Sequence, residues 1–346
     1  MTRSVIDPIT RIEGHLRVEM EVENGVVADA WVSGGCFRGM ELVVQNRTPE
    51  DAAQIVERIC GVCPVSHAHA SSIAGDKAYG ITISNNARIV RNLLEGAQFL
   101  HSHILWLYNL AALDYVNPLN ALQANVDDAY AVALENGLAL HSDLNQLYEK
   151  LAAFADNGQL SIFSGNWFDA DGGEAYVDNP EANLILTSHY LEALKMQARS
   201  SEMAALLGGK MPHVMTSIPG GNMWVPTESK LDDLLAMATE VRDWVNDTVL
   251  ADTVMLAKLY PEVLTFGKGC GRYVAWGVFE NESMELKDRY LPMGVIDDKL
   301  NLSDVQEDLI TEYMGRSWYK GSETYTSPYF VTDPDFTEYN VDDRYS

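Results

Sequence analysis

Two cysteines three positions apart are the residues best suited to chemistry in this sequence. Cys60 and Cys63 form a C-x-x-C pair, and two thiolates at this spacing can chelate one soft metal ion. Gly61 lets the backbone fold closely around such an ion. Arg58 is a nearby cation that favours the thiolate forms, and His67 can hydrogen-bond a metal-bound sulfur. The segment therefore indicates a metal or redox site.

Taken alone, a C-x-x-C pair is compatible with a redox disulfide, half of a zinc site or a metal-cluster ligand pair. A local zinc site fits poorly, because Cys60, Cys63, His67 and His69 crowd into ten positions. Zinc ligand pairs are usually separated by roughly 12 to 15 residues. A thioredoxin-like site requires a strand–helix–strand context, whereas helical patterns flank this pair.

The composition indicates a folded, strongly acidic protein. Of 346 residues, 47% are hydrophobic, which is ample for a core, and 50 acidic residues against 24 basic ones give a net charge of -26. This charge argues against a nucleic-acid partner or an anionic membrane surface. Four cysteines are too few for a disulfide scaffold, so we interpret Cys36 and Cys270 as packed thiols. Residues 1–15 lack the apolar core of a signal peptide, so we expect no export signal in this chain itself.

The sequence before the cysteine pair predicts a hairpin of two strands followed by a helix. Apolar and charged residues alternate over 16–23, Asn24-Gly25 is typical of a tight turn, and 26–33 is the return strand of a hairpin. After the hairpin, Thr48-Pro49 begins a helix that the cysteine pair closes.

Longer helical patterns dominate the remainder. We predict helices over 86–113, 118–158 (several), 180–207 and 228–260, with strand-like runs at 265–300 and a short helix at 303–314. The apolar run 98–113 is interrupted by polar residues, so it indicates a buried helix and not a membrane span. The fold class is therefore mainly α (α+β), a long-helix bundle with an N-terminal antiparallel hairpin or sheet. We divide the sequence into a β region (1–48), a helical bundle (49–264) and a mixed segment with an acidic tail (265–346).

Motifs on both sides of the cysteine segment carry a family resemblance. They are, in order, Arg11-Ile12-Glu13-Gly14-His15, Arg38-Gly39-Met40-Glu41, Arg58 to His67, Gly208-Gly209-Lys210-Met211-Pro212-His213, Gly220-Gly221, Tyr260-Pro261-Glu262, Gly267-Lys268-Gly269 and Ser317-Trp318-Tyr319-Lys320. In order and spacing they resemble the large subunit of [NiFe] hydrogenases, respiratory uptake group, over nearly the whole chain. The first and third motifs are the most specific in combination.

The resemblance implies roles for four residues around the metals. Cys60 corresponds to a terminal nickel ligand, and Cys63 to a thiolate that bridges nickel and iron. The iron of such centres also carries carbon monoxide and cyanide. His67 corresponds to a histidine near a bridging thiolate. Glu13 corresponds to a carboxylate that passes protons, a role that burial would support by raising its pKa; without the family match, an ion pair with Arg11 is the simpler interpretation.

Further positions match the family in a weaker way. Glu41 corresponds to a ligand of Mg²⁺, although taken alone it suits a surface salt bridge. His213 corresponds to a family histidine near the interface with the electron-transfer subunit, and we expect Glu57 to face the same way; a structural role is equally compatible with both. Ser102 occupies a place where many relatives have an aspartate close to the metals and some have serine.

The activity implied by the resemblance is reversible oxidation of H2 to protons and electrons. Electrons must leave through iron–sulfur clusters, and this chain has no spare cysteine set for them, so the clusters belong to a small subunit. A membrane cytochrome b or quinone-linked subunit is a further implied partner. Uptake-type relatives are periplasmic or face outward from the cell membrane after co-export with the small subunit; a cytoplasmic location is the alternative.

The sequence departs from the family at its C-terminal end. The family motif Asp-Pro-Cys-x-x-Cys-x-x-His supplies two more metal cysteines, and here Asp333-Pro334 matches only its first two residues. We therefore expect a split large subunit, in which a separate chain carries the C-terminal half; truncation or cleavage is the alternative origin. The competing functions are a metal-free hydrogenase-like scaffold subunit and a C-x-x-C redox or zinc protein.

Overall fold

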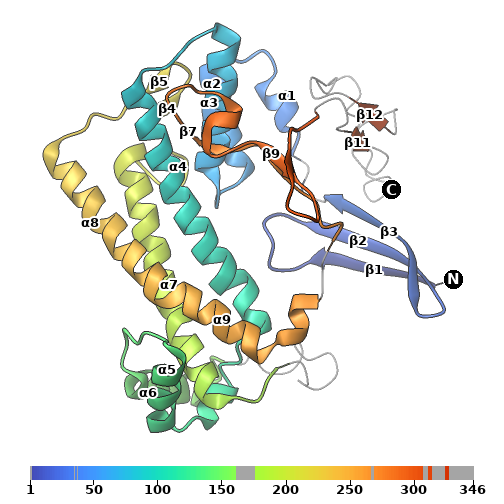
Figure 1. Ribbon diagram of the computed structural model, residues 1–346, viewed down its shortest axis with the longest axis vertical. Helices are drawn as coiled ribbons and strands as arrows, with labels where there is room; N and C mark the ends of the chain where they lie inside the picture. Colours follow the sequence, from blue (N-terminus) through green and yellow to red (C-terminus); the bar gives the residue numbers. More distant parts are fainter. Residues whose placement is uncertain are drawn as a thin grey trace. The chain divides into compact units, whose positions relative to one another are not determined.

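The protein forms two compact units that are each discontinuous in sequence. The computed structural model describes residues 2–34, 36, 38–160, 176–265, 269–306, 311–313 and 324–326 (Figure 1). The unit that contains Cys60 and Cys63, here called the cysteine unit, comprises Met1–Asn92, Ser217–Asn222 and Cys270–Ser346. The helical unit comprises Leu93–Thr216 and Met223–Gly269. The predicted fold class is confirmed, because the chain is mostly helical with small antiparallel sheets. The three-segment division of the sequence stays a prediction.

The cysteine unit begins with an antiparallel sheet in the order β1-β2-β3. The predicted hairpin is present as β2 (Leu16–Glu23) and β3 (Val26–Gly34), joined by Asn24 and Gly25, which both have positive φ. The first strand, β1 (Thr2–Ile9), was not predicted, because its apolar and polar residues do not alternate regularly. It is stabilised by pairing with β2 and by Arg3, which forms an ion pair with the buried Glu19 of β2.

Helices precede and follow the cysteine pair in sequence. They are α1 (Met40–Val44), α2 (Pro49–Val56), the 3₁₀ helix η1 (Glu57–Ile59) and α3 (Pro64–Tyr79). The predicted start of α2 is confirmed, since the Thr48 hydroxyl accepts a hydrogen bond from the Asp51 amide at 3.2 Å. Gly80, in a left-handed conformation with φ 64°, ends α3.

Short strands make up much of the remainder of the cysteine unit. They are β4 (Ser217–Ile218), β5 (Gly221–Asn222), β6 (Tyr273–Ala275), β7 (Val278–Glu280), β8 (Arg289–Leu291), β9 (Gly294–Ile296), β10 (Leu302–Ser303), β11 (Thr311–Tyr313) and β12 (Thr324–Thr326). The helix predicted over 303–314 is wrong. Leu302 and Ser303 pair with β9, and the Ser303 hydroxyl donates to the Val295 carbonyl at 3.4 Å, so this hydroxyl serves a strand and not a helix cap.

The helical unit confirms the long helices and shows where they change pitch. It holds the C-terminal part of α4 (Asn85–Leu105), then α5 (Val126–Asn136), α6 (Leu144–Asp156), α7 (Pro180–Gly208), α8 (Glu228–Trp244) and α9 (Leu250–Leu259). π-helical turns at Trp106–Ala111 and Val245–Val249 interrupt the helices predicted over 86–113 and 228–260. No helix within the described ranges is long and apolar enough to span a membrane.

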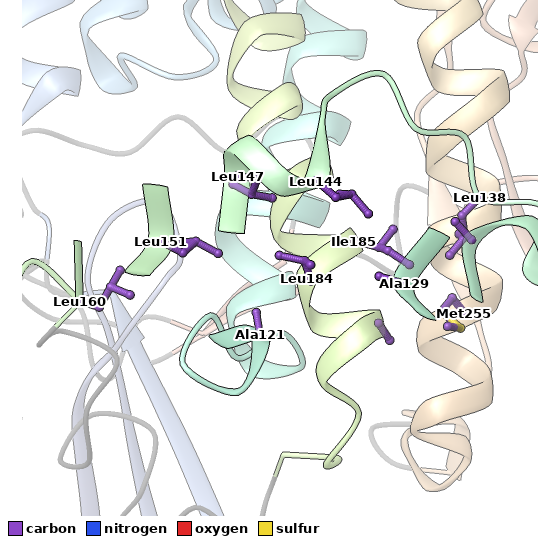
Figure 2. Packing of buried hydrophobic residues seen from close by; sticks show 12 residues of the cluster. Ala121, Ala129, Leu138, Leu144, Leu147, Leu151, Leu160, Leu184, Ile185 and Met255 are labelled. Carbon is purple, nitrogen blue, oxygen red and sulfur yellow. The ribbon is translucent and has the colours of Figure 1, made fainter. Parts of the chain in front are cut away.

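The core of the helical unit lies where α5, α6 and α9 pack on the N-terminal half of α7 (Figure 2). Leu144, Leu184 and Ile185 are fully buried there. Burying a side chain of this size stabilises the fold by about 1.5–3 kcal/mol. The helical unit thus contains its own hydrophobic core.

Candidate metal centre

The backbone between η1 and α3 brings the two cysteines together. Cys60 follows η1 in an extended conformation, and its amide donates to the Glu57 carbonyl at 3.3 Å. Cys63 occupies the N-cap position of α3, immediately before Pro64. The Cys63 amide donates to the Cys60 sulfur at 3.2 Å, so this sulfur lies beside the start of the helix. Cys60 is 7% exposed and Cys63 is half-buried.

The electrostatic surroundings of the pair favour a bound cation. Burial, together with the hydrogen bond and charge of Cys60 and the charge of Glu13, raises the pKa of the Cys63 thiol to about 12. Two neighbouring thiolates and a carboxylate repel one another, so without a cation the second proton stays on sulfur. A soft divalent metal would replace that proton, and metal binding at this pair is expected to release protons.

Glu13 lies in the turn between β1 and β2, where Arg11 and Gly14 both have positive φ. Its charge acts on Cys63, which agrees with the predicted proximity of the two groups. The burial assumed for Glu13 at the sequence level is wrong for the described chain, because its side chain is exposed. The turn presents it on the surface of the cysteine unit. Its role as a proton carrier stays a prediction.

His67 and Glu57 flank the pair on the two adjoining helices. His67 is half-buried one turn into α3, and burial lowers its pKa, which favours a neutral imidazole at pH 7. A neutral ring has one N–H to donate to a sulfur. Glu57 begins η1, the turn before Cys60, and is fully buried. Arg58, by contrast, is exposed and donates to the Gln54 carbonyl in the preceding helix α2.

The motif around residues 38–41 also contacts this segment. Arg38 donates from Nη2 to the Ile59 carbonyl at 2.5 Å, just before Cys60. Glu41, the predicted Mg²⁺ ligand, lies in α1, and its side chain is outside the described part of the structure. Within the described residues there is no group of three or more His, Cys, Asp or Glu side chains that could hold a metal ion.

The remaining predicted positions lie elsewhere. Ser102 accepts a hydrogen bond from Gln98 within α4, and His213 follows the cis Met211-Pro212 bond with φ 66° in the helical unit. The prediction that Cys36 and Cys270 are packed thiols is wrong, because both are exposed, Cys36 after β3 and Cys270 in a turn before β6. Residues 317–320 and 333–334 lie outside the described residues.

Comparison with known proteins decides the family. A model for nickel-dependent hydrogenases matches residues 38–346, and a HoxL-like model matches residues 3–33. The chain belongs to the nickel-dependent hydrogenase family. Hydrogenase-2 large chain of Escherichia coli K12 is 36% identical over 99% of this chain and 64% of its own length. The periplasmic [NiFeSe] hydrogenase large subunit of Desulfomicrobium baculatum is 36% identical over 92% of this chain and 54% of its own length.

Solved hydrogenase structures share the fold. The Ni-Fe-Se hydrogenase from D. vulgaris Hildenborough in the as-isolated oxidized state superposes with a TM-score of 0.73 and 33% identity, covering 95% of this chain and 61% of that one. This hydrogenase-family chain therefore spans between about half and two thirds of the length of the relatives it matches.

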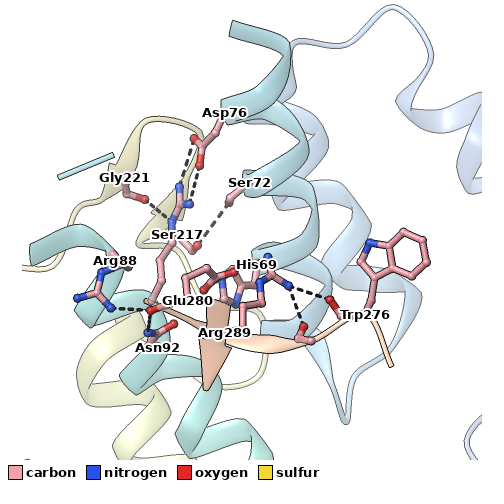
Figure 3. Close-up of polar contacts among 12 residues, drawn as sticks. His69, Ser72, Asp76, Arg88, Asn92, Ser217, Gly221, Trp276, Glu280 and Arg289 are labelled. Atoms are coloured by element: carbon pink, nitrogen blue, oxygen red, sulfur yellow. Dashed lines mark hydrogen bonds and ion pairs between the residues drawn. The ribbon is translucent and has the colours of Figure 1, made fainter. Parts of the chain in front are cut away.

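Sequence reasoning missed the contacts that hold α3 in place behind the cysteines. Arg91 of α4 is buried and binds Asp76 of α3 with Nη1–Oδ2 2.7 Å. It also donates to the carbonyl of Gly221 at 3.1 Å (Figure 3). Arg91 donates further to the Ile218 carbonyl at 2.6 Å, and the Gly220 amide donates to Asp76 at 2.6 Å. The Gly220-Gly221 motif thus serves the helix that begins at Cys63. The only sequence signal for this contact was the Gly-Gly motif itself.

Proposed function

We propose that this chain provides Cys60 and Cys63 as half of the ligand set of a nickel–iron centre in the catalytic large subunit of a hydrogenase. The observation that carries the proposal is the thiol pair at the start of α3, with the Cys63 amide bound to the Cys60 sulfur. Thiolate sulfur is a suitable donor for soft metal ions, and Cys60 and Cys63 provide two such donors beside the start of α3. Membership of the nickel-dependent hydrogenase family supports the choice of metal.

The chemistry requires more ligands than this sequence supplies at the pair. Cys36 and Cys270 are exposed and lie outside the site motif in sequence, so they are not assigned as the other two thiolates. We propose the C-terminal part of a hydrogenase large subunit as the source of these two ligands. A small subunit with iron–sulfur clusters, and a membrane cytochrome b or quinone-linked subunit, complete the electron path. Glu41 holds Mg²⁺, and the assembly faces the periplasm.

When bound, the centre supplies the place where H2 is split into protons and electrons. The residues of this chain hold it and move protons around it. Cys60 and Cys63 provide thiolate sulfur at the metals. The His67 ring donates its N–H toward a sulfur and limits the sulfur's basicity. Glu13 accepts a proton at a carboxylate oxygen from the Cys63 side and releases it to solvent, to which its side chain is open.

The test is the metal content of the complex purified through a tag on this chain. We expect nickel and iron in the wild type and in Cys270→Ser, whose sulfur is exposed and far from the motif in sequence. Cys60→Ser and Cys63→Ser should lose nickel, because oxygen is a poor replacement for a soft thiolate.

The competing functions give different results in the same measurement. Zinc in place of nickel would assign the pair to a zinc or redox protein. Wild-type complex with no metal at all would indicate a scaffold subunit. Mass spectrometry of the same sample should find peptides, beyond these 346 residues, with two further C-x-x-C cysteines and a terminal histidine. Their absence would contradict a C-terminal source of the missing ligands.

A further inference from the structure

α3 is the element that carries the proposed metal site, because its N-cap is Cys63 and His67 lies in its first turns. Two buried side-chain contacts hold this helix. One joins Asp76, near its C-terminus, to Arg91 at 2.7 Å. The other joins His69, close to its N-terminus, to Glu280 of β7, with Nε2–Oε2 3.4 Å. The second pair is the nearer of the two to the cysteines in sequence.

Glu280 is itself held rigidly in the cysteine unit. Its carboxylate binds Arg289 of β8, with Nη2–Oε1 2.9 Å, and its side chain is 3% exposed. Its backbone carbonyl accepts hydrogen bonds from Arg88 at 2.5 Å and Asn92 at 2.8 Å, both on α4 (Figure 3). Strands β7 and β8 and helix α4 therefore all fix the point to which His69 is bound.

The charge state of this group supports a strong contact. Burial alone raises the pKa of Glu280, but His69 and Arg289 outweigh it and lower that pKa to about 2. The carboxylate is therefore ionised at neutral pH. Arg289 holds this charge in place, so the contact with His69 at 3.4 Å restricts where the first turns of the helix can lie.

The periodicity of α3 places His69 on a different side of the helix from His67. Successive residues of an α-helix are rotated by about 100°, so His69 lies about 200° from His67 around the axis. Glu280 therefore holds α3 from the side opposite His67. A contact on that side limits rotation and translation of the first turns without entering the metal site.

We infer that Glu280 is a positioning residue for the proposed centre: through His69 it fixes the first turns of α3, and with them Cys63 and His67. The metal part of this inference rests on the proposed function. The helix part does not, because it concerns only contacts within the cysteine unit. Asp76 and Arg91 fix the other end of the same helix and provide an internal reference.

The experiment compares Glu280→Gln with Glu282→Gln in the purified complex. Glu282 is two residues away and exposed, so its variant makes the same change of charge without touching His69. Hydrogen exchange is measured along α3, and nickel is measured after dialysis against a chelator. In Glu280→Gln we expect exchange over residues 65–69 to become roughly tenfold faster while residues 73–79 keep their protection, and nickel retention to fall roughly tenfold. The control should match the wild type in both.

A second variant tests the other partner of the same contact. His69→Gln leaves the Glu280–Arg289 pair intact and should reproduce the local effect. Adding Glu280→Gln to it should cause little further change, since both act through one contact. Uniformly faster exchange along α3, or no change near Cys63, would overturn the inference. Wild-type complex without nickel would instead overturn the proposed function, and the exchange result would still decide whether Glu280 fixes the helix.

Discussion

Two buried histidine–carboxylate pairs within the described residues have the same chemistry and very different surroundings. In the helical unit, Asp252 accepts from His189 at 2.8 Å and from Tyr108 at 2.7 Å, and the other ring nitrogen of His189 faces the Ala139 carbonyl at 2.7 Å. Both ring nitrogens therefore meet acceptors, which requires a protonated ring. In the cysteine unit, His69 and Glu280 hold a helix whose N-cap residue, Cys63, is half-buried.

The two pairs are expected to differ in their main effect, which is folding stability for one and the position of the cysteines for the other. His189 and Asp252 are almost fully buried by the helices of their own unit, so breaking that pair should cost folding free energy. The pair of His69 and Glu280 contacts the helix that carries the candidate metal site. This site is less enclosed, because Cys63 is half-buried and Glu13 is exposed. Breaking this pair should change the geometry of the cysteines as well as stability. The same kind of contact thus stabilises the fold in the helical unit and positions the candidate metal site in the cysteine unit.

The largest effect on stability is expected for Asp252→Ala. This change leaves the His189 cation buried without its carboxylate and also removes the acceptor of the Tyr108 hydroxyl. The free energy of unfolding should fall by about 3–5 kcal/mol. Urea denaturation followed by circular dichroism measures it. A loss below about 1 kcal/mol would mean that the pair is not a major stabilising contact of the helical unit.

A smaller loss is expected where α3 contacts the loop that precedes β5. A Cβ at Gly75 would lie 2.5 Å from Cγ of Pro219, so Gly75→Ala forces the two segments apart. We expect a destabilisation of about 1–3 kcal/mol, in spite of the better helix propensity of alanine. The control is Gly34→Ala, where nothing lies within 4 Å of the added atom. Equal melting temperatures for the two variants would contradict the close approach.

The stability of the helical unit should depend on pH through the protonation of His189. Burial lowers the pKa of His189, but the hydrogen bond and charge of Asp252, with the charge of Glu192 and the Ala139 carbonyl, outweigh it and raise the pKa above 6.5. A raised pKa means that the contribution is complete below pH 6.5 and is lost as pH rises through the folded-state value. The stability difference between wild type and His189→Gln should therefore shrink above pH 6.5. A difference that grows with pH would show that His189 is buried as the neutral ring.

The smallest effect is expected at the surface of the helical unit. Arg199 binds Glu240 at 2.8 Å, with both side chains well exposed. Glu240→Gln should change the free energy of unfolding by less than about 1 kcal/mol. Chemical denaturation in low and high salt measures this, and a larger loss would remove the contrast between buried and exposed pairs.

The parts of the fold that could be predicted depend on local signals. The turn at Asn24-Gly25, the cap at Thr48 and the end of α7 at Gly208-Gly209 are each set by residues next to one another in sequence. Strand β1 and strand β10 are set by pairing with other strands, which overrode their local patterns. Hydrophobic periodicity placed the helices around residues 106–111 and 245–249 but could not distinguish α- from π-helical turns.

In the candidate site, too, only the residues with a local sequence signal could be predicted. The cysteine pair and His67 were found because the ligands lie within one short motif. The groups that hold them, Glu280 and Arg91, lie far away in sequence and have no motif of their own. The burial of Glu13 was predicted wrongly, because exposure depends on the segments that cover a turn and not on the turn itself.

Infrared spectroscopy of the purified complex tests the central claim most directly. A nickel–iron centre held by Cys60 and Cys63 should show absorption from iron-bound carbon monoxide and cyanide in the wild type. Cys63→Ser should remove these bands, because Cys63 is the proposed bridge to iron, while Cys270→Ser should leave them unchanged. Wild-type complex that contains metal but shows no such bands would contradict the assignment of this cysteine pair to a hydrogenase centre.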